Sequence, residues 1–254
     1  LDKYNEKFHI IHSHEKYDLI EFIDIDCIND LHNDLALLLP TSGSTGSPKL
    51  VKISYKNLYS NTKSISQSLP IESNDVALTT MPMSYSYGLS IVNTHLFNGA
   101  SIVLTNKTMM EKGFWSLFFN TKITTFGGVP FIYKMLKRLK FSEINISTLK
   151  YITQAGGRLD SSLVEYFTSA CRNNNSKFYV MYGQTEATAR MSVLSFKDID
   201  DKKDSIGKAI PGGKFMLVDG KGREVTQDKT GELIYFGDNV SMGYADNYAD
   251  LVME

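Results

Sequence analysis

Cysteine is scarce in this 254-residue sequence, which holds only Cys27 and Cys171. The two lie far apart and neither belongs to a C-x-x-C pair, so the sequence excludes a disulfide-rich scaffold and a cysteine-rich zinc module. Reduced thiols are typical of cytosolic proteins, and we therefore expect a cytoplasmic location.

Long apolar runs are missing as well. No stretch approaches the roughly 18 consecutive apolar residues of a membrane-spanning helix, and residues 1–7 lack the apolar core of a signal peptide. We therefore expect no membrane partner. The sequence does not begin with methionine, and we expect it to be part of a longer polypeptide.

An excess of charge of either sign is also absent, because 27 basic and 28 acidic residues leave a net charge of −1. Without a basic field, nucleic acid and anionic membranes are not expected partners. The apolar content of 42% and the charged content of 22% are ordinary for a globular protein. A chain of this length can bury a full core as one large domain or as two.

What the sequence does contain is a run of glycine and hydroxyl residues between two apolar segments, 35–39 and 50–53. Glycines let a backbone turn and approach a ligand closely, and hydroxyls, consecutive N–H groups and a lysine suit phosphate oxygens. A flexible linker or a hairpin turn has a similar composition, so composition alone leaves both interpretations open. The run consists of Thr41, Ser42, Gly43, Ser44, Thr45, Gly46, Ser47, Pro48 and Lys49.

Short strand patterns alternate with longer helical patterns through the middle of the chain. The clearest helix spans 55–68, with Ser54 as its N-cap and Pro70 beyond its end. Short strands between longer helices are typical of an α/β fold with a doubly wound, mostly parallel sheet flanked by helices. The other expected elements are strands at 75–81, 102–104, 124–130, 149–153 and 178–181 and helices at 88–97, 110–119, 131–139 and 161–171.

Small or polar loops follow four of the expected strands, at 41–49, 82–88, 155–158 and 182–186. In open α/β sheets, ligands bind beyond the carboxyl ends of the strands. We therefore expect the four loops to meet at one binding site.

The pattern changes after about residue 204, where glycines punctuate short strands near 215–218 and 232–236. This change indicates a small β-rich, barrel-like subdomain. We expect residues 1–34 to be a connector or the remnant of a preceding subdomain, residues 35–204 to form the α/β subdomain, and residues 205–254 to form an incomplete β-rich one.

Three motifs resemble the signatures of the adenylate-forming superfamily. The first is the run 41–49, the second is Tyr182-Gly183-Gln184-Thr185-Glu186, and the third is Gly231-Glu232-Leu233 with Gly237, Val240, Gly243 and Tyr244. The group contains acyl-CoA synthetases, adenylation domains of nonribosomal peptide synthetases and firefly luciferase. The resemblance extends from about residue 35 to residue 254 and implies the central part of the family's large N-terminal domain.

The resemblance implies an AMP-forming ligase, which uses ATP to convert a carboxylate to an acyl-adenylate and passes the acyl group to a thiol. The implied cofactors are ATP/AMP and Mg²⁺, and the implied thiol acceptor is CoA or a phosphopantetheine carrier protein. As catalytic residues, Thr185 would bond the α-phosphate and Glu186 would help to hold the metal ion. The implied nucleotide-binding residues are Thr41, Ser42, Gly43, Ser44, Thr45, Gly46, Lys49, Gly156, Gly157, Tyr182 and Gly183.

Tyr182 and Glu186 each have a simpler structural explanation. Tyr182 is expected to stack on adenine, but a core aromatic at a strand end is an alternative. Glu186 is expected to bind the metal ion, but a carboxylate is also favoured by the dipole of a helix N-terminus. Their place within one motif favours the functional interpretation of both.

An acyl pocket is implied beside the nucleotide site, with a small carboxylic acid as substrate. Members of the family that activate amino acids carry an aspartate in the loop after Pro82, where this sequence has Ser86. We therefore expect a non-amino-acid carboxylate and an enzyme of the acyl-CoA synthetase type. The implied lining residues are Tyr85, Tyr87, Phe126, Val129 and Gln154.

The sequence departs from the family's pattern at both ends. Only 40 residues precede the run 41–49, and residues 251–254 end the sequence before the family's ribose-binding aspartate and its C-terminal domain with the catalytic lysine. We expect the missing N- and C-terminal parts of the same polypeptide to be partners of this chain. Without them, we expect the isolated chain to adenylate poorly or not at all.

Two other functional hypotheses stay open. One is an adenylation domain that loads a carrier protein, and the other is a non-catalytic binding or scaffold module that retains the fold. A P-loop is not favoured, because that motif needs four residues between its glycines, and Gly43 and Gly46 are separated by two.

Overall fold

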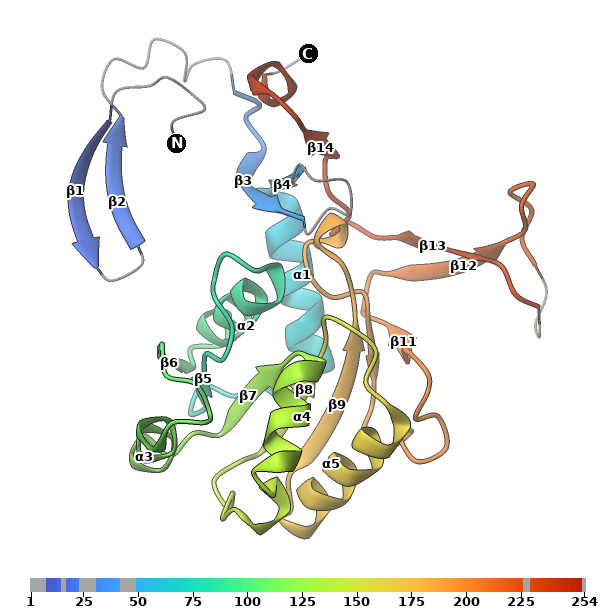
Figure 1. Ribbon diagram of the computed structural model, residues 1–254. Helices are drawn as coiled ribbons and strands as arrows, with labels where there is room; N and C mark the ends of the chain where they lie inside the picture. The colour runs from blue at the N-terminus through green and yellow to red at the C-terminus, as the bar shows by residue number, and fades with distance from the viewer. Residues whose placement is uncertain (1–7, 15–16, 23–30, 42–48, 226–228, 253–254) are drawn as a thin grey trace.

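A computed structural model describes residues 8–14, 17–22, 31–41, 49–225 and 229–252 of the chain. Its centre is a seven-stranded sheet with the order β11-β10-β9-β8-β7-β5-β6 (Figure 1). Strands β5 to β9 pair in parallel, and β10 and β11 extend the sheet antiparallel. The strands are β5 (Val76–Leu78), β6 (Ser101–Val103), β7 (Thr125–Gly128), β8 (Tyr151–Gln154), β9 (Lys177–Tyr182), β10 (Ser192–Leu194) and β11 (Lys208–Ala209).

Helices cover both faces of this sheet, which confirms the predicted α/β fold. Residues of α1 and α2 pack with Tyr151 of β8 on one face, and residues of α3, α4 and α5 pack with Ile152 on the other. Successive strand residues point to opposite faces of a sheet, so each strand contributes to both cores. The helices are α1 (Tyr55–Ser68), α2 (Ser86–Phe97), α3 (Lys112–Asn120), α4 (Pro130–Arg138) and α5 (Ser161–Asn173).

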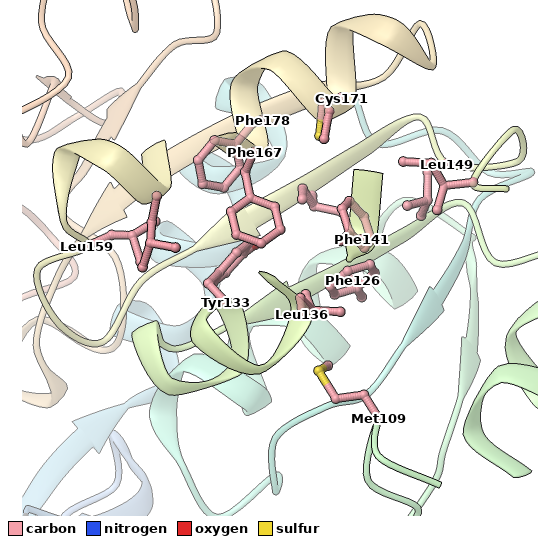
Figure 2. Packing of buried hydrophobic residues seen from close by; sticks show 14 of the residues in the cluster. Met109, Phe126, Tyr133, Leu136, Phe141, Leu149, Leu159, Phe167, Cys171 and Phe178 are labelled. Carbon is pink, nitrogen blue, oxygen red and sulfur yellow. The ribbon is translucent and has the colours of Figure 1, made fainter. Parts of the chain in front are cut away.

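The larger core lies between the sheet and α3 to α5 and is rich in aromatic rings (Figure 2). The rings of Tyr133 and Phe167 meet edge to face with centroids 4.8 Å apart, and those of Phe167 and Phe178 lie 6.0 Å apart. All three side chains are buried. Full burial of a large apolar side chain stabilises a fold by roughly 1.5–3 kcal/mol, and aromatic pairs add about 0.5–1.5 kcal/mol.

Helix α1 begins and ends where the sequence predicts. The Ser54 hydroxyl accepts a hydrogen bond from the Asn57 N–H at 3.0 Å, and the Asn57 side chain accepts one from the Ser54 N–H at 2.9 Å. This reciprocal cap satisfies two backbone donors at the start of the helix. The helix ends before Pro70, which has no N–H to continue it.

A second, three-stranded sheet contains β3 (Leu35–Pro40), β4 (Leu50–Ser54) and β14 (Tyr244–Ala245) in the order β14-β4-β3. All its pairings are antiparallel. The two strands around the run 41–49 therefore do not join the parallel sheet. A parallel connection needs a dozen or more residues, which is more than the nine residues between these two strands.

The C-terminal part of the chain contains a hairpin of β12 (Lys214–Val218) and β13 (Glu232–Phe236). Strand β11 lies beyond residue 204 and is nevertheless the edge strand of the central sheet. The regular elements among the described residues after 204 are this hairpin, two short strands in other sheets and a 3₁₀ turn. Near the N-terminus, β1 (Phe8–His14) and β2 (Tyr17–Phe22) form an antiparallel pair.

Within the described ranges, the longest helices fall short of the length and apolar character that a bilayer crossing requires.

Candidate active site

A cleft with a volume of about 790 Å³ opens at the carboxyl ends of the parallel strands. Loops that follow β5, β8 and β9 form most of its wall, and the ends of β3, β4 and β14 close one side. The loops expected to meet at one site therefore do so in the part of the chain that the structure describes. The cleft is lined by Pro40, Thr41, Lys49, Ser84, Tyr85, Ser86, Tyr87, Ala155, Gly156, Gly183, Gln184, Thr185, Glu186, Ala189 and Tyr244.

The turn after β9 folds back tightly on itself. A Cβ atom on Gly183 would lie 1.8 Å from the carbonyl oxygen of Ala189, so only glycine fits where the two backbone segments cross. The N–H of Met191 donates to the carbonyl of Tyr182 at 2.8 Å and closes the turn at its base. Residues Thr185–Ala187 form a 3₁₀ turn at its tip, which holds Thr185 and Glu186 at the cleft.

Thr185 and Glu186 contact residues from two other walls of the cleft. The Thr185 hydroxyl lies 3.2 Å from the Ser86 hydroxyl at the start of α2. The Tyr244 hydroxyl donates to Glu186 Oε1 at 2.7 Å, and this bond is the main reason that the pKa of Tyr244 is raised. The Lys49 ammonium lies 5.3 Å from the centroid of the Tyr244 ring, within the range of a cation–π interaction.

Tyr87 forms the floor of the cleft and is almost fully buried. Its hydroxyl lies 2.8 Å from Thr153 Oγ1 and donates to the Thr153 carbonyl at 2.9 Å. Its ring faces the guanidinium of Arg190, which lies 4.8 Å from the ring centroid. Burial raises the pKa of Tyr87 and lowers that of Arg190, since each charged form loses hydration.

Tyr85 forms the opposite wall beside Gly156. Gly156 has a φ of +76°, and a Cβ at this position would lie 2.5 Å from the Tyr85 hydroxyl oxygen. The backbone conformation therefore favours glycine here, and any larger residue would also displace the Tyr85 hydroxyl. Burial raises the pKa of Tyr85, so this wall presents a neutral phenol.

Eight of the residues predicted from the sequence line the cleft, and five described ones do not. The eight are Thr41, Lys49, Tyr85, Tyr87, Gly156, Gly183, Thr185 and Glu186. The five that do not line it are Gly157, Tyr182, Phe126, Val129 and Gln154. Predictions for Ser42, Gly43, Ser44, Thr45 and Gly46 lie outside the described residues.

Phe126 and Gln154 are turned away from the cleft by local geometry. Phe126 packs against Phe118 and Phe141 in the larger core. The amide of Gln154 is buried and donates to the carbonyls of Ala155 and Gly157. Both residues point to the α3–α5 face of the sheet, opposite Tyr87 and Thr153, because side chains alternate along a strand.

Val129, Gly157 and Tyr182 lie close to the cleft without lining it. Val129 Cγ1 would lie 3.0 Å from a Cβ on Gly156, so it supports that wall from behind. A Cβ on Gly157 would meet the ring of Pro130 at 3.2 Å. Tyr182 is the last residue of β9 and is partly buried.

Four residues that the sequence did not single out as site residues contribute to the geometry. Tyr244 reaches Glu186 across 58 positions of sequence, and Gln184 and Ser84 line the cleft. Arg190 supports Tyr87 from below. Tyr244 carried a local signal, since it falls within the third motif, and Arg190 lies four residues beyond the end of the second motif.

The donor set suits Mg²⁺ bound together with phosphates. Glu186 offers a carboxylate at the cleft and Thr185 a hydroxyl, both of which are hard oxygen donors. No cluster of three or more His, Cys, Asp or Glu side chains occurs among the described residues. A soft or fully protein-ligated metal site is therefore not indicated there, whereas Mg²⁺ typically takes one or two carboxylates with phosphate and water.

Comparison with known proteins places these features in a family context. The profile described as "AMP-binding enzyme" matches residues 15–245. Acyl-CoA ligase sidI of Aspergillus fumigatus is 27% identical over 225 residues, covering 86% of this chain and 37% of that protein. D-alanine–D-alanyl carrier protein ligase of Bacillus licheniformis is 28% identical over 217 residues, covering 83% of this chain and 43% of that protein. The chain spans about two fifths of the length of these relatives.

The fold is also found among solved structures. The o-succinylbenzoate CoA synthetase from Bacillus subtilis, solved in complex with the acyl-adenylate intermediate OSB-AMP, superposes with a TM-score of 0.75 and 24% identity. The match covers 85% of this chain and 43% of that chain. The likeness shows that the two chains share a fold.

Proposed function

Because the chain belongs to the AMP-binding enzyme family, we propose that it forms the ATP- and acid-binding part of an AMP-forming ligase. The ligase converts a non-amino-acid carboxylate and ATP to an acyl-adenylate and pyrophosphate, and then transfers the acyl group to a thiol. CoA is the acceptor in this proposal, as the acyl-CoA synthetase type requires.

The observation that carries the proposal is the meeting of all three motifs at one cleft. Lys49 ends the first motif, Glu186 belongs to the second and Tyr244 to the third, and these three side chains contact one another in series. A cation and a carboxylate at one end of a cleft suit a polyphosphate with its metal ion. The aromatic residues Tyr85 on the opposite wall and Tyr87 on the floor suit an organic acid.

The proposed reaction begins when a carboxylate oxygen attacks the α-phosphorus of ATP, so that the bond to the pyrophosphate oxygen breaks. Thr185 is placed to donate to an α-phosphate oxygen, and Ser86 lies within hydrogen-bond distance of its hydroxyl. Lys49 is placed to attract the phosphates that leave as pyrophosphate. Such groups act because they are oriented before charge develops.

The proposed cofactor is Mg²⁺, held by Glu186 with the phosphates. When bound, it would neutralise charge on the phosphoryl oxygens during transfer. The Tyr244 hydroxyl donates to Glu186 Oε1, and a carboxylate has further acceptor sites on its second oxygen, through which it would hold the metal ion.

The proposed substrate class follows from the polarity of the cleft. Among the described lining residues, Glu186 is the one carboxylate, and in this proposal it is committed to the metal ion while it accepts a hydrogen bond from Tyr244. The ammonium group of an α-amino acid bound beside Tyr85 and Tyr87 would therefore lack an opposite charge, which disfavours an α-amino acid as substrate. An acyl or aryl acid without an amino group suits these walls better.

Two alternatives keep the same cleft. A carrier protein in place of CoA is favoured by the similarity to D-alanine–D-alanyl carrier protein ligase. A non-catalytic module that retains the fold would still bind nucleotide but would release no pyrophosphate. These alternatives differ in their acceptor and in turnover, so one assay separates them.

The test is pyrophosphate release by the product of the complete gene, screened over carboxylic acids with CoA or a carrier protein. We expect release that depends on an acid without an amino group. Thr45→Val and Glu186→Ala should each lower the rate at least about tenfold, since each removes a phosphate or metal contact. Glu143→Ala, which alters an exposed glutamate paired with Lys140, is the matched control and should leave the rate unchanged.

Two results would contradict the proposal. Unchanged rates in both Thr45→Val and Glu186→Ala would remove the site assignment. Nucleotide binding without pyrophosphate release for any acid would favour the non-catalytic alternative.

A further inference from the structure

Residues 237–244, which we call the bracing segment, lie against the turn that carries Glu186. The segment connects β13 to β14 (Figure 1). The Ser241 N–H donates to the Glu186 carbonyl at 2.8 Å, and Asn239 Nδ2 donates to the Ala187 carbonyl at 2.9 Å. The backbone of the turn is therefore held by a segment more than 50 residues further along the chain.

The next residue of the turn, Thr188, has a backbone conformation that needs support. Its φ is +68°, which is unusual for a β-branched residue. Conformations of this kind cost about 1–3 kcal/mol and persist where the surroundings fix them. The buried Thr188 hydroxyl donates to the Asn239 carbonyl at 2.7 Å, so the bracing segment supports the strained residue directly.

Asn239 is the centre of these contacts and is buried, with 4% of its surface exposed. Its amide oxygen accepts a hydrogen bond from the Tyr235 hydroxyl at 2.9 Å, while its amide nitrogen donates to Ala187. Both ends of the amide are thus used, and the direction of the side chain is fixed. A buried network with all partners satisfied is rigid.

The bracing segment is itself tied to the start of α1. The Nδ2 atom of Asn57 donates to the Asp238 carbonyl at 2.8 Å and to the Val240 carbonyl at 2.7 Å. Asn57 is the residue that caps α1 together with Ser54. The two carbonyls flank Asn239, so the helix holds the backbone on both sides of it.

The far end of the bracing segment reaches the Glu186 side chain. Tyr244 pairs with Val51 of β4, and its hydroxyl donates to Glu186 Oε1 at 2.7 Å. One segment therefore fixes both the backbone and the carboxylate of Glu186.

We propose that Asn239 is a positioning residue, which orients the Glu186 carboxylate toward the metal ion of bound Mg·ATP. The inference rests on the proposed function, because it assigns the metal to Glu186. Residues that orient a metal ligand through hydrogen bonds typically change metal affinity by about 10–100-fold when altered. Asn239 touches the backbone of the turn rather than the substrate, so its effect passes through Glu186.

The test compares Asn239→Asp with Asn61→Asp as a matched control. Each substitution keeps the shape of the side chain and turns a carboxylate oxygen toward a backbone carbonyl, that of Ala187 at 2.9 Å or that of Arg190 at 2.8 Å. Asn61 is equally buried, at 2% exposure, and its partner Arg190 lies at the base of the turn, where Asn239 Nδ2 has only a longer contact of 3.5 Å, rather than next to Glu186. The two variants therefore carry a similar local repulsion at different places.

The readout is the dissociation constant of ATP, measured by calorimetry on the full chain with Mg²⁺ and with a chelator. For metal-free ATP, we expect the dissociation constant of Asn239→Asp to stay within about twofold of that of the unsubstituted chain. We expect the factor by which Mg²⁺ lowers the dissociation constant of ATP to be about tenfold smaller in Asn239→Asp. In Asn61→Asp, Mg²⁺ should lower the dissociation constant of ATP as much as it does in the unsubstituted chain. If Asn239 had only a structural role, the substitution would change the dissociation constants of ATP with and without Mg²⁺ by the same factor. An unchanged effect of Mg²⁺ on the dissociation constant in Asn239→Asp would therefore overturn the proposal.

A second pair of variants applies if Asn239→Asp does not fold. Thr188→Val removes the hydroxyl that bonds Asn239 and keeps the shape, whereas Thr188→Ser keeps the hydroxyl. We expect a weaker Mg²⁺ effect in Thr188→Val alone, and equal effects in the two variants would overturn the proposal. An unsubstituted chain that binds no ATP would contradict the proposed function instead.

Discussion

The two faces of the central sheet differ in what they bury. The α3–α5 face is filled with apolar and aromatic side chains, of which Phe114, Phe118, Phe141 and Phe167 have at most 2% of their surface exposed. The α1–α2 face also buries Arg190, Asn61 and His95. Of these three, Arg190 contacts the ring of Tyr87, which lines the cleft.

The difference shows how stability and positioning are divided within one fold. Apolar contacts are non-directional and stabilise in proportion to buried area, so the α3–α5 face can hold the sheet together. Hydrogen bonds and ring contacts are directional, and those of Tyr87 and Arg190 fix the floor of the cleft. Arg190 makes no ion pair with a described carboxylate, and its Nε atom has no described hydrogen-bond partner, which argues that stability is not its main contribution.

The largest expected effect comes from a cavity in the apolar face. Phe167→Ala should lower the free energy of unfolding by about 3–5 kcal/mol, because a fully buried ring that contacts Tyr133 and Phe178 is lost. Urea unfolding measures this difference. Phe119→Ala, at a position that is 47% exposed, is the control and should cost much less.

The cavity also tests the division between the faces. Folded Phe167→Ala should bind ATP as the unsubstituted chain does, since Phe167 lies on the far side of the sheet from the cleft. A large loss of ATP affinity at a temperature where the variant is folded would show that the two faces are coupled.

A smaller effect on stability is expected from the polar face. Arg190→Met keeps the volume and removes a buried charge, so the free energy of unfolding should stay within about 1 kcal/mol or rise. The same variant should lower acid-dependent pyrophosphate release roughly tenfold, because Tyr87 loses the guanidinium beneath its ring. Urea unfolding and the release assay measure the two quantities, and a loss of stability as large as that of Phe167→Ala would contradict the comparison.

The smallest expected effect is a pH dependence from His95. The ring is buried, with Nδ1 2.7 Å from the Ile91 carbonyl and Nε2 3.1 Å from the Tyr151 hydroxyl, and burial lowers its pKa below 6.5. On acidification the unfolded chain therefore binds the proton first. The stability contribution is complete above pH 6.5 and is lost as the pH falls below it toward the lowered value.

A variant isolates the contribution of His95 from that of other groups. His95→Gln should unfold with a smaller change in free energy between pH 7 and pH 5.5 than the unsubstituted chain, as measured by urea titration at each pH. His32→Gln, at a partly exposed position, is the control. Equal pH dependence in His95→Gln and the unsubstituted chain would exclude this role.

Local signals in the sequence were sufficient for much of the fold. Helix α1 was predicted with the bounds that it has, because the residues that start and end it, Ser54 and Pro70, lie within two residues of its ends. Strand–helix alternation likewise predicted the parallel sheet and the convergence of its loops. These features depend on neighbours in sequence.

Features that depend on distant residues were not predictable in this way. Phe126 and Gln154 sit beside residues of the cleft in sequence, but strand alternation turns them to the other face. Asn239 and Tyr244 contact the Glu186 turn across more than 50 residues, and no local pattern indicates such pairs. The pairing of β4 with β14 is of the same long-range kind.

The central claim is that the cleft joins a carboxylate to AMP, and isotope transfer tests it most directly. The product of the complete gene is supplied with ATP, thiol acceptor and an acid labelled with ¹⁸O in its carboxylate. If a carboxylate oxygen attacks the α-phosphorus, the released AMP must carry one ¹⁸O atom, detected by mass spectrometry. Turnover that leaves AMP unlabelled, or that places the label in inorganic phosphate, would contradict the account.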